Sequence, residues 1–362
     1  MRRKVEVALG ARSYVIEIGS GMDEVLAAFV RHAGYSAHGM IVTDTNVGPL
    51  YAAHTAAQIA RGGVAAEIVT IPAGEASKSL SVANDLYTQA IALGLDRRSP
   101  IFALGGGVVG DLAGFIAATY MRGVPFVQLP TSLLAQVDSS VGGKVAVNHA
   151  RGKNLIGAFY QPDAVIMDLD RLQTLPAREI ATGLGEIIKY GIIADAEFFA
   201  WLEMHHDDVL ALTPAAGAHM IARSCEIKAD VVRQDECEGG LRRILNFGHT
   251  LAHAIEKETG YVRYRHGEAV AIGMIGAARI SRAMGLLSDE ACARIERLIA
   301  AMGLPCTVEG VSPDAMYADL FHDKKTVGGR IHWVLAEGIG RVCVRSDVSE
   351  EIVRHAIKGL LT

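Results

Sequence analysis

The stretch IFALGGGVVGDLAGFIAATY, residues 101–120, joins an apolar strand pattern, a glycine-rich turn and an apolar helical pattern. Residues 101–104 are the short, continuous apolar run that is typical of a strand buried inside a parallel sheet. At the turn, backbone N–H groups and the N-terminus of the following helix would form a cradle for a phosphate group. The glycines sit at other offsets than in the GxGxxG dinucleotide fingerprint, so a purely structural tight turn remains an alternative.

Strand and helix patterns alternate on both sides of this stretch. Residues 4–9 and 13–18 alternate with the period of strands and predict an opening hairpin. Further strands are expected at 39–43, 65–70, 126–129 and 164–168, and helices at 24–32, 49–61 and 80–93. This alternation predicts a mostly parallel sheet that is covered by helices on both faces.

Beyond Pro176 the pattern becomes mainly helical. Amphipathic segments are expected at about 177–191, 195–204, 214–232, 245–259, 266–284 and 288–302, and a late hairpin at 330–335 and 341–344. The fold class that we predict is therefore an α/β N-terminal domain with a mostly parallel sheet, residues 1–172, followed by a mainly α-helical C-terminal domain, residues 173–362.

Composition narrows the range of partners. Half of the 362 residues are hydrophobic and 21% are charged, which predicts a large buried core, and the net charge of −5 disfavours non-specific binding to nucleic acid. The five cysteines are scattered, which predicts neither a disulfide framework nor a cysteine zinc site and suits a cytoplasmic location. Because no apolar run reaches 18 residues, we expect neither a signal peptide nor a membrane span.

A set of polar residues lies within the apolar segment RRILNFGHTLAHAIE, residues 242–256. If the segment is helical throughout, its polar members share one face; they are Arg242, Asn246, His249 and His253. Such groups are costly to bury without partners, so the face should meet a polar cavity, a ligand or a metal. The alternative is a solvated helix face with two incidental histidines.

Glu186 and Lys189 in GLGEIIKYG are three residues apart on one helical face, among apolar residues. A carboxylate in such surroundings requires a cation. Glu186 together with two of His249, His253 and His266 would suit zinc with an open coordination position. Spacing alone does not decide which two histidines are the ligands.

Two other segments carry candidate ligand-binding groups. PAGEASK, residues 72–78, follows a predicted strand and places Glu75 and Lys78 at a strand end, where a glutamate would accept hydrogen bonds from ribose hydroxyls. The segment 129–162 contains Asp138, Lys144, Lys153 and Asn154 beside small residues. Lysines that converge on one site indicate a phosphorylated or carboxylated substrate, although ordinary surface lysines are the alternative.

Six motifs, taken together and in order, resemble the 3-dehydroquinate synthase family of sugar phosphate cyclases: GGGVVGDLAGF, LPTSLLAQVDSSVGGK, KNLIGAFYQP, GLGEIIKYG, LNFGHTLAHAIE and RHGEAVAIGM. The resemblance extends from about residue 74 to residue 325. It implies an N-terminal NAD-binding domain, a helical C-terminal domain, one divalent metal, zinc or cobalt, in the cleft between them, and a homodimer.

The resemblance also implies roles for individual residues. The implied metal ligands are Glu186, His249 and His266. The implied substrate-binding residues are Arg122 (reaching across the dimer contact), Asp138, Lys144, Asn154, Lys189, Lys228, Arg242, Asn246, His253 and Lys324. The implied NAD-binding residues are Glu75, Lys78, Gly106, Gly107, Val108, Asp111, Thr131, Ser132, Lys144, Lys153 and Thr174. Thr131-Ser132 replaces the paired threonines that are common in the family, and it keeps both hydroxyls.

The implied reaction is that of a carbon–oxygen lyase, which converts 3-deoxy-D-arabino-heptulosonate 7-phosphate to 3-dehydroquinate and phosphate. It proceeds by oxidation at C5 by NAD, elimination of phosphate, re-reduction, ring opening and aldol closure, and the implied catalytic residues are Lys144, Asn154, Glu186, Lys189 and His253. Three alternatives remain: a cyclase that makes 2-deoxy-scyllo-inosose or valiolone-type rings, a metal-dependent dehydrogenase of the glycerol dehydrogenase kind, and a binding protein without catalysis.

Overall fold

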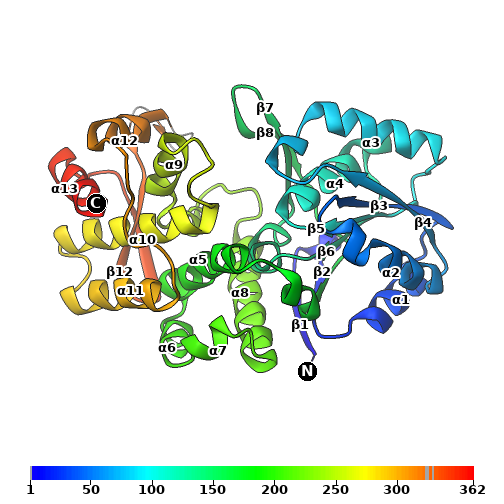
Figure 1. Cartoon of the computed structure of the whole chain (residues 1–362), viewed down its shortest axis with the longest axis horizontal. Helices are drawn as coiled ribbons and strands as arrows, with labels where there is room; N and C mark the ends of the chain where they lie inside the picture. The colour runs from blue at the N-terminus through cyan, green and yellow to red at the C-terminus, as the bar shows by residue number, and fades with distance from the viewer. Residues whose placement is uncertain (1, 323–325, 328–329) are drawn as a thin grey trace. The chain divides into compact units, whose positions relative to one another are not determined.

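The computed structural model describes residues 2–322, 326–327 and 330–362, and its backbone contacts divide the chain into two units (Figure 1). Unit 1 comprises residues 1–175 and 217–233, and unit 2 comprises residues 176–216 and 234–362. The predicted fold class is confirmed, because unit 1 contains the mostly parallel sheet and unit 2 is mainly helical. Among the described residues, no helix is both long and apolar enough to cross a membrane.

A seven-stranded sheet forms the centre of unit 1, and its strands lie in the order β1-β2-β9-β6-β5-β3-β4. The strands are β1 (Arg3–Val7), β2 (Tyr14–Gly19), β3 (His38–Asp44), β4 (Ala65–Ile71), β5 (Ile101–Gly105), β6 (Phe126–Pro130) and β9 (Ala164–Asp168). Only β1 and β2 pair antiparallel within this sheet, as the opening hairpin that was expected. The parallel strands therefore bring their carboxyl ends to one edge, where ligands bind in open α/β sheets.

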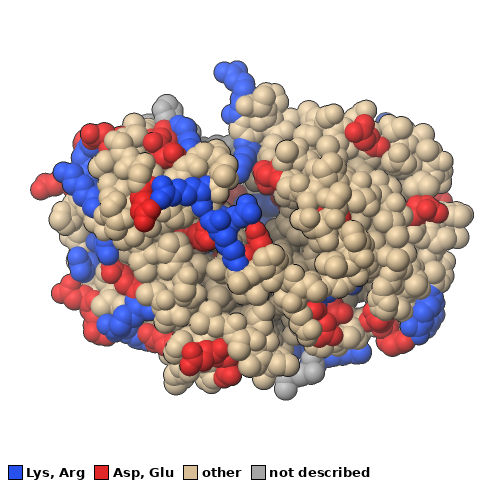
Figure 2. All heavy atoms as spheres, in the orientation of Figure 1, with Lys and Arg blue, Asp and Glu red and all other residues tan. Residues whose placement is uncertain are grey.

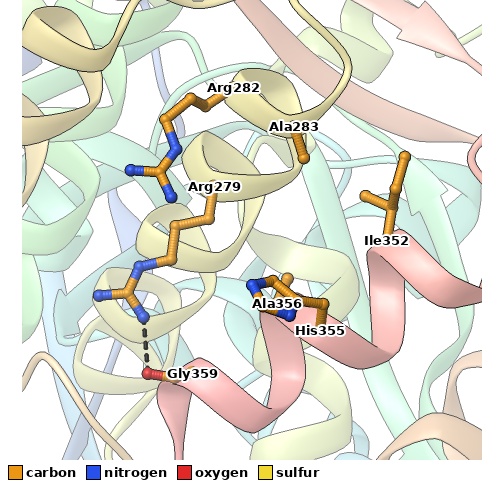
Figure 3. Close-up of a pocket in the computed structure, with 7 residues that line it drawn as sticks. All are labelled: Arg279, Arg282, Ala283, Ile352, His355, Ala356 and Gly359. Carbon is orange, nitrogen blue, oxygen red and sulfur yellow. Dashed lines mark hydrogen bonds between the residues drawn. The ribbon is translucent and has the colours of Figure 1, made fainter.

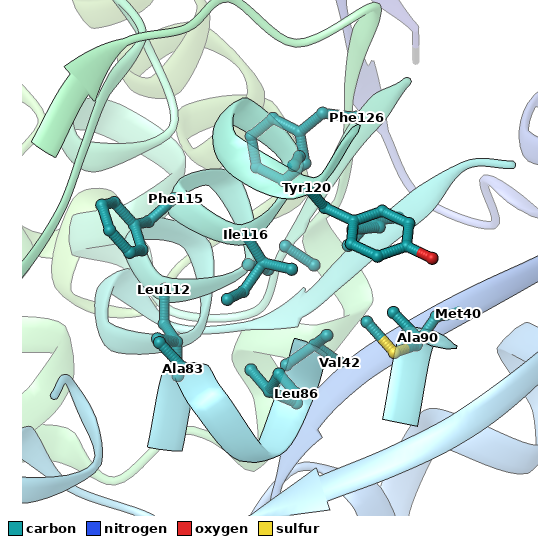
Figure 4. Packing of buried hydrophobic residues seen from close by; sticks show 14 of the residues in the cluster. Met40, Val42, Ala83, Leu86, Ala90, Leu112, Phe115, Ile116, Tyr120 and Phe126 are labelled. Carbon is teal, nitrogen blue, oxygen red and sulfur yellow. The ribbon is translucent and has the colours of Figure 1, made fainter. Parts of the chain in front are cut away.

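Helices cover both faces of this sheet, as the strand-helix alternation predicted. The helices α1 (Asp23–His32) and α2 (Gly48–Arg61) pack through Leu26 and Ile59 against one face. The helices α3 (Leu80–Ala92) and α4 (Gly107–Thr119) pack through Leu86 and Ile116 against the other face, where Phe126 also lies (Figure 4). Because both faces are covered, the central strands are buried and mostly apolar at successive positions.

A second hairpin in unit 1 consists of β7 (Lys144–His149) and β8 (Gly152–Phe159), which the sequence did not predict as strands. Val145 and Val147 of β7 are buried in the same core as α4. The other face of the hairpin carries polar and exposed residues, and this mixture hid the strand pattern. The hairpin places three predicted site residues, Lys144, Lys153 and Asn154, on one antiparallel ribbon.

Unit 2 is built from helices and short hairpins. The helices are α5 (Ala177–Ala194), α6 (Ala196–Met204), α7 (His206–Leu210), α9 (His249–Glu258), α10 (His266–Ala283), α11 (Asp289–Ala301), α12 (Pro313–Asp319) and α13 (Glu350–Leu360). The strands are β10 (Thr326–Val327), β11 (Arg330–Ile331), β12 (Trp333–Gly338) and β13 (Arg341–Arg345). The remaining long helix, α8 (Pro214–Gln234), lies with residues 217–233 in unit 1. The surface shown in Figure 2 carries interspersed acidic and basic side chains, in keeping with the small net charge.

The segment 242–256 is not a single helix, so the premise of a common helical face was wrong. Leu241–Asn246 forms a 3₁₀ helix, the chain turns at Gly248 with a left-handed backbone (φ 79°), and α9 begins at His249. Arg242 and Asn246 therefore precede the helix that carries His249 and His253. Gly248 is required here, because a side chain rarely adopts this backbone conformation.

Close backbone contacts between glycines hold α5, α9 and α10 together. A Cβ atom on Gly267 of α10 would lie 1.9 Å from the carbonyl oxygen of Thr182 in α5. A Cβ atom on Gly273 of α10 would lie 2.1 Å from the carbonyl oxygen of Gly248, just before α9. Any side chain at either glycine would force these helices apart.

We expect Gly267→Ala to destabilise the protein by at least about 1–3 kcal/mol, because the added methyl group overlaps the backbone of α5. The measurement is the denaturant midpoint of unfolding. Gly217→Ala is the matched control, since Gly217 also lies in a helix and a Cβ atom there meets nothing within 4 Å. Equal midpoints for Gly267→Ala and the parent protein would contradict this close packing.

Candidate metal centre and ligand-binding residues

Three predicted ligands meet inside unit 2. Glu186 of α5 is fully buried, and its Oε1 lies 3.4 Å from Nε2 of both His249 and His266. One ligand atom from each residue lies within 4.8 Å of the other two. Zinc binds carboxylate oxygen and imidazole nitrogen at about 2.0–2.2 Å, so two ligand atoms about 3.4 Å apart suit a shared ion. The residue types and their spacing therefore fit a divalent metal.

The two imidazole rings are held with Nε2 directed at this point. Nδ1 of His249 donates to the carbonyl oxygen of Phe247 at 3.2 Å, and Nδ1 of His266 lies 3.1 Å from Oε1 of Glu256. A proton on Nδ1 leaves the lone pair of Nε2 for a metal. Glu256 was not among the predicted site residues, because it lies at the end of α9 and contacts His266 of the next helix, a relation that no sequence period shows.

The electrostatics of the cluster favour a cation. Burial alone lowers the pKa of His266, but hydrogen bonds to Glu186 and Glu256 outweigh burial and raise that pKa to about 10. Lys189, which is almost fully buried, also forms an ion pair with Glu186 through Oε2. Glu186 thus has imidazole nitrogens beside Oε1 and the ammonium group of Lys189 beside Oε2. The Lys189 ammonium is a cation of the kind that a carboxylate in apolar sequence surroundings requires.

Other predicted residues of unit 2 lie on α9 and on the 3₁₀ helix that precedes it. The His253 ring is one turn after His249 on α9, with 5.8 Å between the ring centroids. Arg242 is buried in the 3₁₀ helix, where Nη1 donates to the carbonyl oxygen of Glu236 at 2.5 Å. Asn246 ends that 3₁₀ helix. Lys324 lies outside the described residues.

In unit 1, the glycine-rich turn lies at the carboxyl end of β5. Gly106 precedes α4, Gly107 is its first residue, and Val108 follows in its first turn. The Thr131 N–H donates to the carbonyl oxygen of Gly105 at 2.9 Å, so the segment after β6, which includes Ser132, lies beside this turn. The N-terminus of α4 therefore presents free N–H groups and its positive dipole end at the strand edge.

Charged groups surround the same edge of unit 1. Lys78 is buried and forms an ion pair with Asp111 of α4. The exposed Glu75 lies in a 3₁₀ turn three residues earlier. Thr174 ends another 3₁₀ turn, where its hydroxyl lies 2.6 Å from that of Tyr51.

A second polar pair of unit 1 joins α8 to the segment after β6. Nζ of Lys228 donates to Oδ1 of Asp138 at 2.6 Å and to its carbonyl oxygen at 2.7 Å. Asp138 lies in a π-helical turn, Ala135–Ser139, a type of distortion that is common at functional sites. Sγ of Cys225 also contacts the carbonyl oxygen of Gln136 at 3.4 Å. These contacts explain why most of α8 groups with unit 1.

Arg122 lies in an exposed turn after α4. Met121 and Arg122 both adopt left-handed backbone conformations, with φ of 49° and 68°. Two consecutive non-glycine residues in this region store backbone strain, which is often found at functional sites.

A different cavity, of about 250 Å³, lies between α10 and α13 (Figure 3). Arg279 donates across it to the carbonyl oxygen of Gly359 at 2.6 Å. Its lining also includes Arg282, Ile352 and His355, and it contains none of the predicted site residues described above.

Comparisons with known proteins agree on one family. Residues 68–182 match the family described as 3-dehydroquinate synthase N-terminal, and residues 183–326 match the family described as 3-dehydroquinate synthase C-terminal. The 3-dehydroquinate synthase of Desulforamulus reducens is 52% identical over 347 residues, which cover 96% of this chain and 97% of that protein.

Solved cyclases share the fold at lower identity. A 2-deoxy-scyllo-inosose synthase complexed with carbaglucose-6-phosphate, NAD⁺ and Co²⁺ aligns with a TM-score of 0.90 and 27% identity over 99% of this chain and 100% of its own. A 2-epi-5-epi-valiolone synthase from Streptomyces hygroscopicus, with NAD⁺ and Zn²⁺ bound, aligns with a TM-score of 0.88 and 30% identity over 98% of both chains.

We expect Glu256→Gln to weaken metal binding by about 10- to 100-fold, because the amide no longer anchors the His266 ring as a carboxylate does. The measurement is competition for Zn²⁺ or Co²⁺ against a chromogenic chelator. Glu258→Gln is the control, since this carboxyl lies beside Asp319 instead. Unchanged affinity in Glu256→Gln would rule out this orienting role.

Proposed function

We propose that this chain, which belongs to the 3-dehydroquinate synthase family, converts 3-deoxy-D-arabino-heptulosonate 7-phosphate to 3-dehydroquinate and phosphate. The observation that carries the proposal is the meeting of Glu186, His249 and His266 in one buried cluster. These are the residues at which the resemblance places the metal ligands. The 52% identity to a 3-dehydroquinate synthase, against 27–30% to the two solved cyclases, favours this ring product over inosose or valiolone rings.

The cofactors that we assign are NAD and one divalent ion, zinc or cobalt. Solved neighbours contain NAD⁺ with Co²⁺ or with Zn²⁺. The ion, held by Glu186, His249 and His266, would polarise the substrate hydroxyls and lower their pKa. NAD would serve as acceptor and then donor of one hydride, so it is needed only in catalytic amounts.

Residues of the N-terminal domain, 1–172, together with Thr174 just beyond it, are assigned to NAD. Glu75 would accept hydrogen bonds from ribose hydroxyls, and the N–H groups of Gly106, Gly107 and Val108 would bind the pyrophosphate at the start of α4. The Lys78–Asp111 ion pair would fix the edge of this site. The other assigned NAD contacts are Thr131, Ser132, Lys144, Lys153 and Thr174.

The substrate-binding groups are assigned to both sequence domains, with the metal and most polar groups in residues 173–362. Lysine and arginine side chains would position the phosphate and the carboxylate; they are Lys144, Lys189, Lys228, Arg242 and Lys324. Asp138, Asn154 and Asn246 would bind hydroxyl groups. The C6 proton would pass to the substrate's own phosphate, so these residues orient groups there, whereas His253 would relay the proton of the C5 hydroxyl.

We further propose that the protein is a homodimer in which Arg122 binds the substrate phosphate of the partner protomer. The strained, exposed turn at Met121 and Arg122 supports this assignment, since strain of this kind persists where it holds a functional side chain.

The test of the function is phosphate release from the heptulosonate phosphate with NAD below the enzyme concentration. We expect many phosphates per NAD, no accumulation of NADH, and loss of activity on treatment with a chelator that Zn²⁺ or Co²⁺ reverses. Phosphate that stops at one per NAD, or a steady rise of NADH absorbance, would instead favour a dehydrogenase.

Complementation tests the dimer. Neither Arg122→Ala nor Glu186→Gln should be active alone. When equal amounts of the two variants are mixed and their protomers reassort, about a quarter of the parent activity should return, because half of the dimers are mixed and each mixed dimer has one complete site out of two. The measurement is phosphate release before and after reassortment. An Arg122 that acts within its own protomer would give no recovery.

A further inference from the structure

Asn148 joins the predicted NAD segment to the predicted substrate hairpin of unit 1. Its Nδ2 donates to Oε1 of Glu75 at 2.7 Å, and its Oδ1 accepts from the N–H of Asn154 at 2.9 Å. Its backbone N–H donates to the carbonyl oxygen of Lys78 at 2.8 Å. Asn148 thus contacts the predicted NAD segment through two hydrogen bonds and the predicted substrate residue Asn154 through a third.

The orientation of the Asn148 amide follows from its partners. The backbone N–H of Asn154 is only a donor, so it must face the amide oxygen, and the Glu75 carboxylate is an acceptor, so it must face the amide NH₂. Among the common side chains of this size, asparagine offers an oxygen acceptor and a nitrogen donor in one plane. Aspartate would keep the acceptor for Asn154 but would place a second carboxylate against Glu75.

Each side-chain contact of Asn148 meets an exposed group in a turn. Glu75 is exposed, in a three-residue 3₁₀ turn that follows Gly74. Asn154 is also exposed and adopts a left-handed backbone conformation with φ of 54°. The hydrogen bond between Oδ1 of Asn148 and the N–H of Asn154 spans the turn of the β7–β8 hairpin and stabilises this conformation. The hydrogen bond from the backbone N–H of Asn148 to the carbonyl oxygen of Lys78 attaches the hairpin to the Glu75 turn.

We propose that Asn148 is a positioning residue, which orients Glu75 toward the NAD ribose and holds Asn154 in its substrate-binding conformation. This inference rests on the proposed function. With Oε1 of Glu75 bound to the Asn148 amide, Oε2 would be the oxygen that accepts from ribose hydroxyls. Because the same side chain holds the hairpin, the two binding elements keep a fixed relation to each other.

Two substitutions separate the two side-chain hydrogen bonds of Asn148. Asn148→Asp removes only the hydrogen bond to Glu75, and we expect the Kd for NAD to rise about tenfold or more, since a hydrogen bond to a charged group is lost and repulsion is added. Asn148→Ala removes the hydrogen bonds to both Glu75 and Asn154, and we expect in addition a severalfold higher KM for the sugar phosphate. Binding of NAD is measured directly by calorimetry, with no substrate present.

The pH dependence is the readout that a merely structural role would not change. A proton shared between two adjacent carboxylates restores the lost hydrogen bond, so the NAD affinity of Asn148→Asp should recover toward that of the parent protein as the pH falls from 8 to 5. The control is His149→Ala, whose ring accepts from the Arg151 N–H at 3.1 Å within the hairpin turn and, among the described residues, forms no hydrogen bond with Glu75 or Asn154.

The outcomes distinguish this proposal from the proposed function. NAD affinity of Asn148→Asp within twofold of the parent at every pH, or an equal loss in His149→Ala, would overturn the role of Asn148. A parent protein that binds NAD but releases no phosphate would refute the proposed reaction, while a tenfold, pH-dependent loss in Asn148→Asp would still support the positioning of Glu75. A parent protein that binds no NAD would overturn both.

Discussion

Backbone-to-backbone packing of α10 against its two neighbours is the constraint on which the metal centre depends. Each of the three candidate ligands is the immediate neighbour of a glycine in these contacts: Glu186 follows Gly185, His249 follows Gly248, and His266 precedes Gly267. The carboxylate and the imidazoles approach each other closely because the helices that carry them do. The chemistry of the cluster is therefore a consequence of how these backbones pack, and the hydrogen bonds that the rings donate to the Phe247 carbonyl and to Glu256 then set the direction of each ring.

Unit 1 organises its polar groups by a different principle. The parallel sheet brings the turn after β5, the segment after β6 and the turn after β4 to one edge, where the N-terminus of α4 adds a positive dipole end. The ion pairs Lys78–Asp111 and Lys228–Asp138 are largely buried there. Removal of either lysine would leave the carboxylate beside it with an uncompensated charge, which is costly in a buried position.

The sheet and the long helices were predictable from the sequence, because each buries a regular apolar pattern. The strand expected at 39–43 spans 38–44, and the helix expected at 266–284 spans 266–283. The segment 144–159 was missed, since its few apolar residues alternate with polar and exposed ones. The break at Gly248 was missed because apolar residues on both sides continue a helical rhythm. Helix α13 was not anticipated, although Ser349 caps it and two glutamates follow in its first turn.

The candidate ligands were identified from residue type, and the resemblance, not spacing, selected His266 over His253. Spacing places His249 and His253 one turn apart, but it contains no information about α10, whose His266 reaches Glu186 through tertiary packing alone. Glu256 and Asn148 were missed for a related reason. Their contacts join residues 10 and 73 positions apart, and hydrogen-bond partners at such separations leave no periodic trace in one sequence.

The left-handed turn at Gly248 has a consequence for how such a scaffold diversifies. It separates the segment with Arg242 and Asn246 from the helix with His249, so substitutions in the first leave the direction of the second unchanged. If Arg242 and Asn246 bind the substrate and His249 binds the metal, as proposed, a lineage would be free to accept a new sugar phosphate by altering the 3₁₀ segment while the metal ligands stay in place. A single continuous helix would have tied substrate preference and metal ligation to the same rotation.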